Sequence, residues 1–328
     1  MWTLSELARD IDETRARILR HRRALGERFV RRDEELDLLT LCAAAQEPLL
    51  FVGAPGTAKS DMVVKFVESL GLGEGDYFEY MLTKFTEPGE ILGPVDIEAL
   101  KQGRFVRRTH ARLPEARVAF LDEVFKGNSA ILNTLLTLVN ERKFYQDGAA
   151  TPARLALLFG ATNEVPDAPE LDALADRFVL KVETLPVKDT HFTELIDAGA
   201  RNEVLRATAQ RPWVRGDASL DDYLRFKAYL DLAAAAADPA EDRARWFPAP
   251  VFAEFRRVIR ALELEDRVVV SDRKAVKLYR LIRARAFLHH GGAVRHDDLS
   301  LLAYVGNRRH ELAPVAQKVR ALLSLPGR

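Results

Sequence analysis

The sequence predicts an α/β fold with a parallel five-stranded sheet in residues 1–185 and an all-helical region in residues 186–328. Short apolar runs alternate with helical patterns in the first region, which is typical of a mostly parallel sheet covered by helices on both faces. These runs occupy 49–52, 77–82, 117–121, 155–161 and 178–182. Strand signals then disappear, and the remaining patterns are helical at 188–209, 220–236, 249–264, 272–290 and 296–325.

Two segments flank or interrupt this pattern. Residues 4–45 predict two helices broken near Gly26. The stretch "DLAAAAADPAEDRA" is low in complexity, and we interpret it as a solvent-exposed helix end or linker and not as a site.

Composition narrows the class of protein. The chain has 328 residues, 49 basic and 49 acidic, so its formal net charge of zero does not favour a general polyanion binder. Its single cysteine, Cys42, excludes an internal disulfide and fits a reducing compartment. The charged start lacks a signal-peptide core, and no run approaches the ~18 apolar residues of a membrane span. We therefore expect a cytoplasmic protein without a membrane span.

The first apolar run leads into a phosphate-binding loop. The segment "GAPGTAKS" matches G-x-x-x-x-G-K-[ST] and lies between a strand and a helix, the context that this motif requires. Its residues are Gly53, Ala54, Pro55, Gly56, Thr57, Ala58, Lys59 and Ser60. The glycines let backbone N–H groups surround an anion, and the following helix adds the positive end of its dipole. We expect Lys59 to neutralise the β- and γ-phosphates of a nucleoside triphosphate and the Ser60 hydroxyl to ligate Mg²⁺.

An acidic pair ends the third apolar run. Asp122 and Glu123 follow "VAFL" at the carboxyl end of a predicted strand, where sites in open α/β sheets are found. Asp122 would hold Mg²⁺ through water, and Glu123 would polarise the attacking water as a general base. The alternative is a pair of solvated carboxylates that begin a helix.

A polar residue ends the next strand. Asn163 follows the run 155–161, so we expect it between the loop and the acidic pair, where its amide can orient the attacking water. The alternative is an asparagine that favours a turn before Pro166. Thirteen residues later, "ADRF" places Asp176 and Arg177 just before the last strand.

The spacing of these motifs resembles that of the AAA+ ATPases. The segments "KFTEPGEILGPVDIEALKQGRFVRR", "LPEARVAFLDEVFKGNSAILNTLLTLVNERKF" and "VVVSDRKAVKL" are similar to the MoxR family, and in particular to the ATPase module of RavA. The resemblance runs from about residue 4 to about residue 325. It implies a P-loop AAA+ core with a helical lid, and a homo-oligomeric ring, usually a hexamer, that binds ATP and Mg²⁺ between neighbouring subunits.

The resemblance also implies roles for individual residues. Arg177 would be the arginine finger that reaches the neighbour's γ-phosphate, and Arg142 is a rival for this role. Arg273 would be the sensor-2 arginine of the lid, contacting the γ-phosphate of its own subunit. Phe29 and Val30 would pack on adenine, although they read almost equally well as core residues beneath the first helices.

An inserted hairpin is expected near 94–114, where "PVDIEALKQGRFVRRTHARLP" carries Arg104, Arg107, Arg108 and Arg112. A solvated, charged hairpin is the favoured interpretation, and phosphate binding is the alternative.

The function implied is an ATP hydrolase that remodels or matures a protein client, with a partner that carries a von Willebrand factor A domain. The sequence does not identify the client. Two alternatives stay open: a nucleotide-gated scaffold with incidental hydrolysis, and a nucleic-acid motor that uses the arginine-rich insert. The zero net charge makes a nucleic-acid partner the less favoured of the two.

Overall fold

The computed structural model describes residues 2–166 and 168–324 of the chain. Its centre is a five-stranded sheet in the order β2-β3-β6-β1-β7, in which every neighbouring pair is parallel. The strands are β1 (Leu49–Val52), β2 (Tyr77–Met81), β3 (Val118–Asp122), β6 (Leu157–Thr162) and β7 (Leu180–Glu183). The predicted fold class and number of core strands are therefore confirmed.

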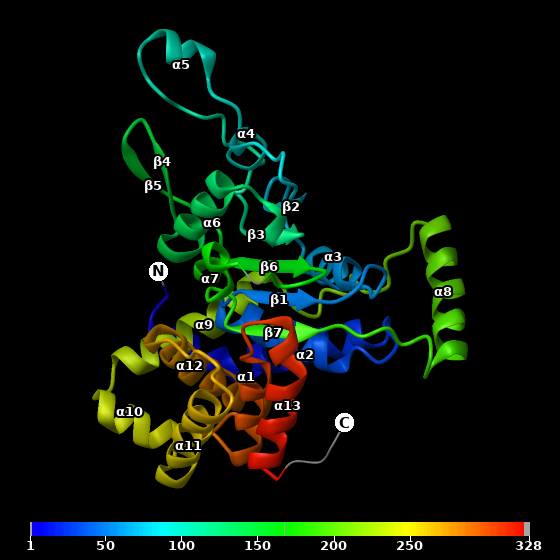
Figure 1. Ribbon diagram of the computed structural model, residues 1–328, viewed down its shortest axis with the longest axis vertical. Coiled ribbons are helices and arrows are strands. Elements are labelled where there is room, and N and C mark those ends of the chain that lie inside the picture. Colours follow the sequence, from blue (N-terminus) through cyan, green and yellow to red (C-terminus); the bar gives the residue numbers. More distant parts are fainter. Residues whose placement is uncertain (1, 167, 325–328) are drawn as a thin grey trace.

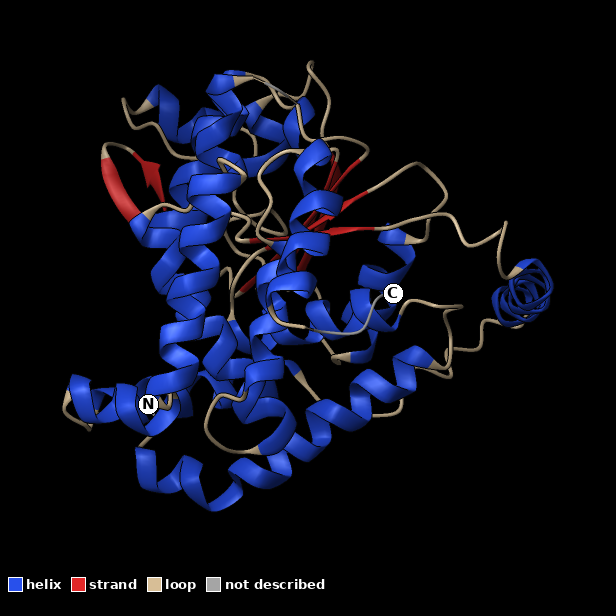
Figure 2. Ribbon diagram, turned by 60° about the horizontal axis from the view of Figure 1, so that its bottom comes forward, coloured by secondary structure: helices blue, strands red, loops and turns tan. Residues whose placement is uncertain are grey.

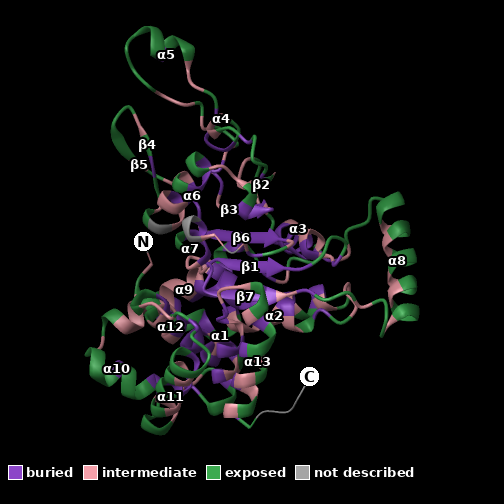
Figure 3. Ribbon diagram, viewed as in Figure 1, coloured by how far each residue is buried: buried purple, intermediate pink, exposed green. Residues whose placement is uncertain are grey.

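Strands β1, β3, β6 and β7 are largely buried on both faces, which explains their continuous apolar runs, whereas the edge strand β2 is partly exposed (Figure 3). Alternate residues of β1 enter different clusters: Leu49 and Phe51 pack with the helices of the second half, while Leu50 and Val52 pack with the helices around β3. This alternation follows from the two-residue period of a strand.

The remaining elements of the first half surround this sheet (Figure 1). They are α1 (Leu4–Gly26), α2 (Asp33–Ala45), α3 (Lys59–Ser69), α4 (Pro88–Leu92), α5 (Ile97–Lys101), the 3₁₀ turn η1 (Val124–Lys126), α6 (Ser129–Glu141), the hairpin strands β4 (Lys143–Gln146) and β5 (Ala149–Pro152), and α7 (Pro169–Ala175).

The second half is helical, as expected, with different boundaries. It holds α8 (Phe192–Ala207), α9 (Leu220–Ala235), α10 (Pro239–Trp246), α11 (Ala249–Glu265), α12 (Asp272–His290), the 3₁₀ segment η2 (His296–Tyr304) and α13 (Arg309–Leu322). The stretch interpreted as a linker contains α10, whose N-cap Asp238 accepts from the backbone of Ala240 and Glu241. The single helix predicted over 296–325 is instead η2 followed by α13.

The insert differs from the predicted hairpin. Residues 94–114 form a loop that carries α5, and one antiparallel bridge, Val95 with Arg107, closes it. The regular hairpin is β4-β5, which the sequence interpretation missed. The two segments project together at the top of Figure 1, and Phe105 and Asp147 join them through two hydrogen bonds of 2.9 Å. We call residues 94–114 and 143–152 together the projecting unit.

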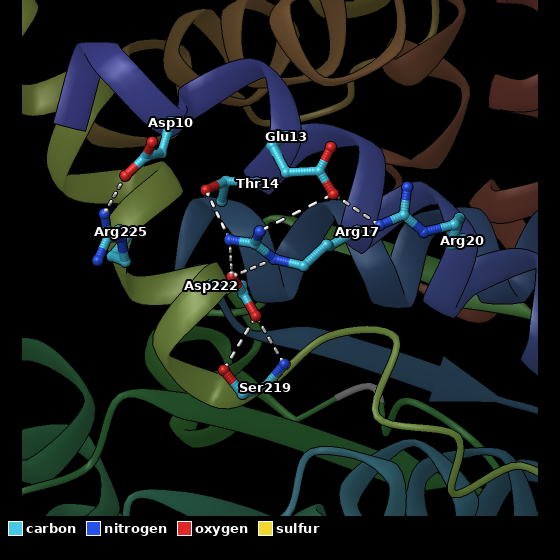
Figure 4. Close-up of polar contacts among 8 residues, drawn as sticks. All are labelled: Asp10, Glu13, Thr14, Arg17, Arg20, Ser219, Asp222 and Arg225. Atoms are coloured by element: carbon cyan, nitrogen blue, oxygen red, sulfur yellow. Dashed lines mark hydrogen bonds and ion pairs between the residues drawn. The ribbon is translucent and has the colours of Figure 1, made fainter.

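The first helices pack on the second half of the chain, although the sequence grouped them with the core. Helix α1 lies along α9, where Arg17 donates to Asp222 at 2.6 Å and Arg225 pairs with Asp10 at 3.4 Å (Figure 4). Asp222 also accepts from Ser219 and so belongs to the cap of α9. One apolar core therefore continues from α1 and α2 through the sheet into α12.

Two buried lysines lie where the sheet meets the helical half. Lys274 of α12 donates to the Val305 carbonyl at 2.6 Å and to Asn307 at 2.7 Å, and Lys181 of β7 is also buried. Burial lowers the pKa of Lys274 to about 8, against the opposing effect of Asp176. Keeping this ammonium buried at neutral pH costs folding free energy.

This cost predicts a pH dependence. Between the folded pKa of about 8 and the ordinary lysine pKa of 10.5, the unfolded chain binds more protons than the folded chain, so stability rises with pH through this window. Urea unfolding from pH 7 to 10 should show wild type gaining about 1–3 kcal/mol relative to Lys274→Met. The surface variant Lys188→Met is the control and should follow wild type. Equal pH slopes for wild type and Lys274→Met would contradict the assignment.

Candidate active site

The phosphate-binding loop connects β1 to α3 at the carboxyl edge of the sheet. Gly56 has φ of 81°, a region that favours glycine, and Ala58 also lies there, with φ of 67°. A Cβ on Gly53 would lie 2.4 Å from the Thr184 carbonyl oxygen, so only glycine fits where the chain leaves β1. The loop conformation therefore requires glycine at both fixed positions of the motif.

The ammonium of Lys59 points into this loop. Lys59 is the first residue of α3, is 7 % exposed, and donates to the carbonyls of Gly53 at 2.6 Å and Ala54 at 2.9 Å. Burial lowers its pKa, while the nearby Asp122 and Glu123 carboxylates favour the charged form. The loop thus holds a cation beside the backbone N–H groups of a helix start, which suits a phosphate chain.

The acidic pair lies directly beside the loop. Ser60 Oγ is 3.5 Å from Asp122 Oδ2, and Asp122 Oδ1 accepts from the backbone N–H of Glu123 at 2.9 Å. Glu123 adopts the left-handed region, with φ of 51°, which is uncommon outside glycine and asparagine. This turn directs the Glu123 side chain away from β3 and toward the neighbouring strand β6.

Glu123 and Asn163 meet between these strands. The Asn163 amide donates to Glu123 Oε1, which also lies 3.3 Å from the ammonium of Lys126. Glu123 is 8 % exposed, and its Oε2 is buried without a hydrogen-bond partner among the described residues. An orphaned carboxylate oxygen at this position can accept a proton from a water molecule held in front of it.

The oxygen donors at this edge fit a magnesium ion. The Ser60 hydroxyl and the Asp122 carboxylate are hard ligands, and Mg²⁺ commonly uses one or two such groups together with waters and substrate phosphates. Within the described residues no group of three or more His, Cys, Asp or Glu side chains gathers into a metal site. The residues therefore suit Mg²⁺ carried by a nucleotide better than a metal held by protein ligands alone.

Two predicted site residues lie at the opposite edge. Arg177 precedes β7, and β1 and β7 run parallel, so the paired length of these strands, about 13 Å, separates it from the loop. Arg273 belongs to the same region, because Ser271, two residues before it, donates to Asp176, the residue before Arg177, at 3.3 Å. Arg273 is exposed in the first turn of α12. The structure therefore places the start of α12 near the residues that enter β7, and a contact of Arg273 with a γ-phosphate stays a prediction.

Arg142 is occupied within its own chain. Its guanidinium donates to the Leu155 carbonyl and, at 3.4 Å, to the Gln46 carbonyl. Burial lowers its pKa. Through these contacts Arg142 links the end of α6 to the segments that precede β6 and β1. Arg177 is therefore the better interface candidate.

Phe29 and Val30 lie beside α3 and α8. The Phe29 ring is partly buried, 5.3 Å from the Lys65 ammonium, and both residues line a hollow of about 60 Å³ with Ala198 and Asn202. This position is near the helix that follows the phosphate loop. It also agrees with the alternative that these are core residues.

Thr184 is a site residue that the sequence interpretation missed. It follows β7, and its carbonyl and hydroxyl oxygens pack against Gly53. Its hydroxyl oxygen is 3.0 Å from that of Thr57. Lys126, which contacts Glu123, was missed as well. Neither belongs to a fixed motif, and only the pairing of β7 with β1 brings Thr184 to the loop.

Comparisons with known proteins identify the family of this chain. Residues 16–219 match the model of the MoxR domain in the MoxR-vWA-beta-propeller ternary systems, and residues 251–319 match an AAA lid domain. Two uncharacterized proteins of Methanocaldococcus jannaschii, MJ0812 and MJ0079, are each 42% identical over 161 residues, 49% of this chain and 42% of theirs. The structural protein ORF618 of Acidianus two-tailed virus is 35% identical over 139 residues, 41% of this chain and 22% of its own length.

A solved structure agrees over almost the whole chain. The crystal structure of a protein from Cytophaga hutchinsonii, described as a candidate ATPase, superposes with a TM-score of 0.72 at 18% identity, covering 99% of this chain and 98% of the other. That likeness concerns the fold. The chain spans less than half the length of the curated relatives that it matches. Because the MoxR-domain model covers more than half of the 328 residues, the protein belongs to that family and is an AAA+ ATPase of MoxR type.

Proposed function

We propose that the protein is an ATP hydrolase that works as a ring and uses the energy of hydrolysis to remodel a protein client. One observation carries the proposal. The carboxyl edge of the sheet gathers the buried Lys59 ammonium, the Ser60–Asp122 oxygen pair and the orphaned Glu123 oxygen beside the Asn163 amide. These groups are the ones that phosphoryl transfer to water requires.

Each residue has a distinct role in this proposal. Lys59 and the loop N–H groups bind the β- and γ-phosphates, while Ser60 and Asp122 hold Mg²⁺ directly and through water. Mg²⁺, when bound with ATP, supplies neutralisation of phosphate charge. Glu123 accepts the proton of the attacking water, and Asn163 holds the Glu123 carboxylate and that water in line with the γ-phosphate.

The arginines require a second subunit. Because Arg177 and Arg273 lie at the edge opposite the loop, they would reach the nucleotide of a neighbour in a ring, which we expect to be a hexamer. A guanidinium supplied in trans stabilises the charge that develops on the transferred phosphoryl group and contributes about 10³–10⁵ in rate. Arg142, held by its own chain, is not needed in this scheme.

The partner we propose carries a von Willebrand factor A domain. Support comes from the family description, which places such MoxR domains in systems with a vWA and a beta-propeller component. We expect a chaperone-like role in the cytoplasm, and a special closeness to RavA stays a prediction. No helix among the described residues is long and apolar enough to cross a membrane.

A nucleic-acid motor is disfavoured by the contacts of the insert. Arg107 donates to the Gly93 carbonyl, Arg108 pairs with Asp96 at 3.0 Å, and Arg112 donates to the Glu90 carbonyl. These contacts occupy part of the donors that a phosphate backbone would use, and the zero net charge adds to this argument. A scaffold with incidental hydrolysis remains the second candidate, and turnover measurements decide between the two.

Removal of the proposed base separates binding from chemistry. Glu123→Gln should bind ATP like wild type and hydrolyse it about 10²–10⁴-fold more slowly, because general-base catalysis contributes that much. Isothermal titration and a steady-state phosphate-release assay measure the two quantities. Lys59→Ala is the contrasting variant and should lose ATP binding. Unchanged turnover in Glu123→Gln would remove Glu123 as the base, and near-zero turnover in wild type would favour the scaffold.

Mixing two inactive variants tests the trans arginine. Arg177→Ala and Glu123→Gln should each be inactive alone. In rings mixed at equal amounts, about a quarter of the sites would combine an intact Glu123 with a neighbour's intact Arg177. The phosphate-release assay should therefore recover a corresponding fraction of wild-type activity. Mixed rings, shown by native mass spectrometry, without recovery would place the finger elsewhere.

The ATP-trapped ring should retain its partner. Glu123→Gln held in ATP should co-purify a von Willebrand factor A domain protein, identified by mass spectrometry, because hydrolysis can no longer release it. Lys59→Ala, which cannot take up ATP, is the control and should recover much less. Equal recovery with both variants, or recovery of nucleic acid only, would contradict the proposed partner.

A further inference from the structure

The large apolar side chains that the structure exposes fall mainly into three groups. One belongs to β2, the loop after it and the projecting unit (Met81, Phe85, Ile97, Leu100, Phe105 and Tyr145), one to α8 and the segment before it (Leu185, Phe192, Ile196 and Val204), and one to the region around the start of α12 (Leu264, Val269 and Val276). Exposed apolar side chains that lie next to one another on a surface can mark an interaction site, and α8 places several of them on one helix.

Helix α8 has apolar residues on two sides, and one set lies on the side away from the protein. Ala198, Asn202 and Leu205 are partly buried against the body of the protein. On the other side, Phe192, Ile196, Ala200 and Val204 recur every four residues and form one ridge, which we call the α8 ridge. Phe192 is 63% exposed, Ile196 54% and Val204 62%. Figures 1 and 2 show the helix standing apart from the other elements.

The α8 ridge lies on the nucleotide side of the chain. Helix α8 follows β7 through the segment that begins with Thr184, which contacts the phosphate loop. Near the start of α8, Glu194 lies 3.7 Å from Arg31. The last turn of α8 lines a hollow together with Asp61 and Val64 of α3. A neighbour that brings Arg177 to this nucleotide must therefore approach the side that carries α8.

A groove lies on the arginine side. A hollow of about 460 Å³ between α9, α10 and α12 is bordered by Ala45 and Glu47, which precede β1 at the amino edge of the sheet. Its apolar lining is Leu230, Ala234, Val276 and Tyr279. Val276 is 60% exposed and lies one turn beyond Arg273.

Most of the charged side chains that line this groove have partners, and three of the ion pairs lie within it. Lys227 pairs with Asp231, and Arg283 pairs with Asp242 at 2.9 Å. What the groove offers to a partner is consequently its apolar strip. An apolar helix ridge entering an apolar groove is a common form of recognition between protein surfaces.

We propose that the α8 ridge of one copy docks in the α9–α10–α12 groove of a second copy. This inference rests on the proposed ring function. The two surfaces are different and lie at opposite edges of the sheet, so the contact is head-to-tail and can repeat around a ring. Docking at Val276 would deliver the neighbour's Arg273, and Arg177 beside it, to the nucleotide next to the docked helix.

A cross-linking experiment tests the contact. Cys42 is fully buried, and burial raises the pKa of its thiol, so this cysteine should not react with a maleimide. Introduced cysteines are then the ones that the reagent labels. With ATP and Mg²⁺, Ile196→Cys/Val276→Cys should react with a short bismaleimide to give a ladder of covalent multimers. Each single variant should stay monomeric, and a mixture of the two single variants should stop at dimers.

Other outcomes would overturn the proposal. A double variant that cross-links only within one chain would mean that α8 folds onto its own protein. A ladder equally strong in Ile196→Cys alone would mean a symmetric contact between two α8 helices. Rings that form, by sedimentation velocity, without any ladder would mean that α8 faces something other than the groove.

Substitution of the ridge gives a second, independent readout. Phe192→Ser/Ile196→Ser changes exposed side chains only, so circular dichroism and ATP affinity should match wild type. The concentration at which rings form should rise at least tenfold, and ATP turnover should fall with assembly. Phe192→Leu/Ile196→Leu keeps an apolar ridge and should assemble like wild type. Normal assembly of the serine variant would overturn the docking, whereas loss of ATP binding in wild type itself would overturn the proposed function.

Discussion

The parallel pairing of β1 between β6 and β7 is the constraint on which the rest of the structure depends. Because all the strands point the same way, the chain leaves β1, β3 and β6 at one edge. The loop of Lys59, the acidic pair and Asn163 therefore converge there. The same direction puts the residues that enter β7 at the other edge. Phosphate-binding groups and Arg177 are separated by the length of the sheet, and the proposed ring would bring them together from two chains.

The helical half is not an independent lid resting on this sheet. Its α9 lies along α1 through the Arg17–Asp222 ion pair, and its α12 meets Asp176 through Ser271. The buried Lys274 fixes the chain near Val305 to α12. A movement of α12 would therefore shift Asp176 and, with it, the adjacent Arg177. The buried ammonium is costly, and it persists because its two acceptors would otherwise lose their donor.

The positions of the exposed apolar side chains fit a site formed between neighbouring chains, as proposed. Apolar side chains that the core does not use appear on the projecting unit, along the α8 ridge and around the start of α12. The last two groups lie on opposite sides of the nucleotide-binding chain, near the loop and near the arginines. The first stands apart from both, on the unit that the insert and β4-β5 form together, which leaves it available to a different molecule.

By itself the sequence determined the class of fold, the five core strands and the residues of the phosphate loop, because these depend on local patterns. A buried parallel strand is an apolar run, and the loop is a fixed motif between strand and helix. It missed α10, although Asp238 and Pro239 are start signals, because the alanine run before them looked like a linker. Three placements came from the folded structure alone: Thr184 lies against Gly53, Arg142 donates to carbonyls of its own chain, and Ser271 at the start of α12 donates to Asp176. Those placements arise from contacts between residues far apart in the chain, and spacing along a sequence carries no record of which edge of a sheet a helix will meet.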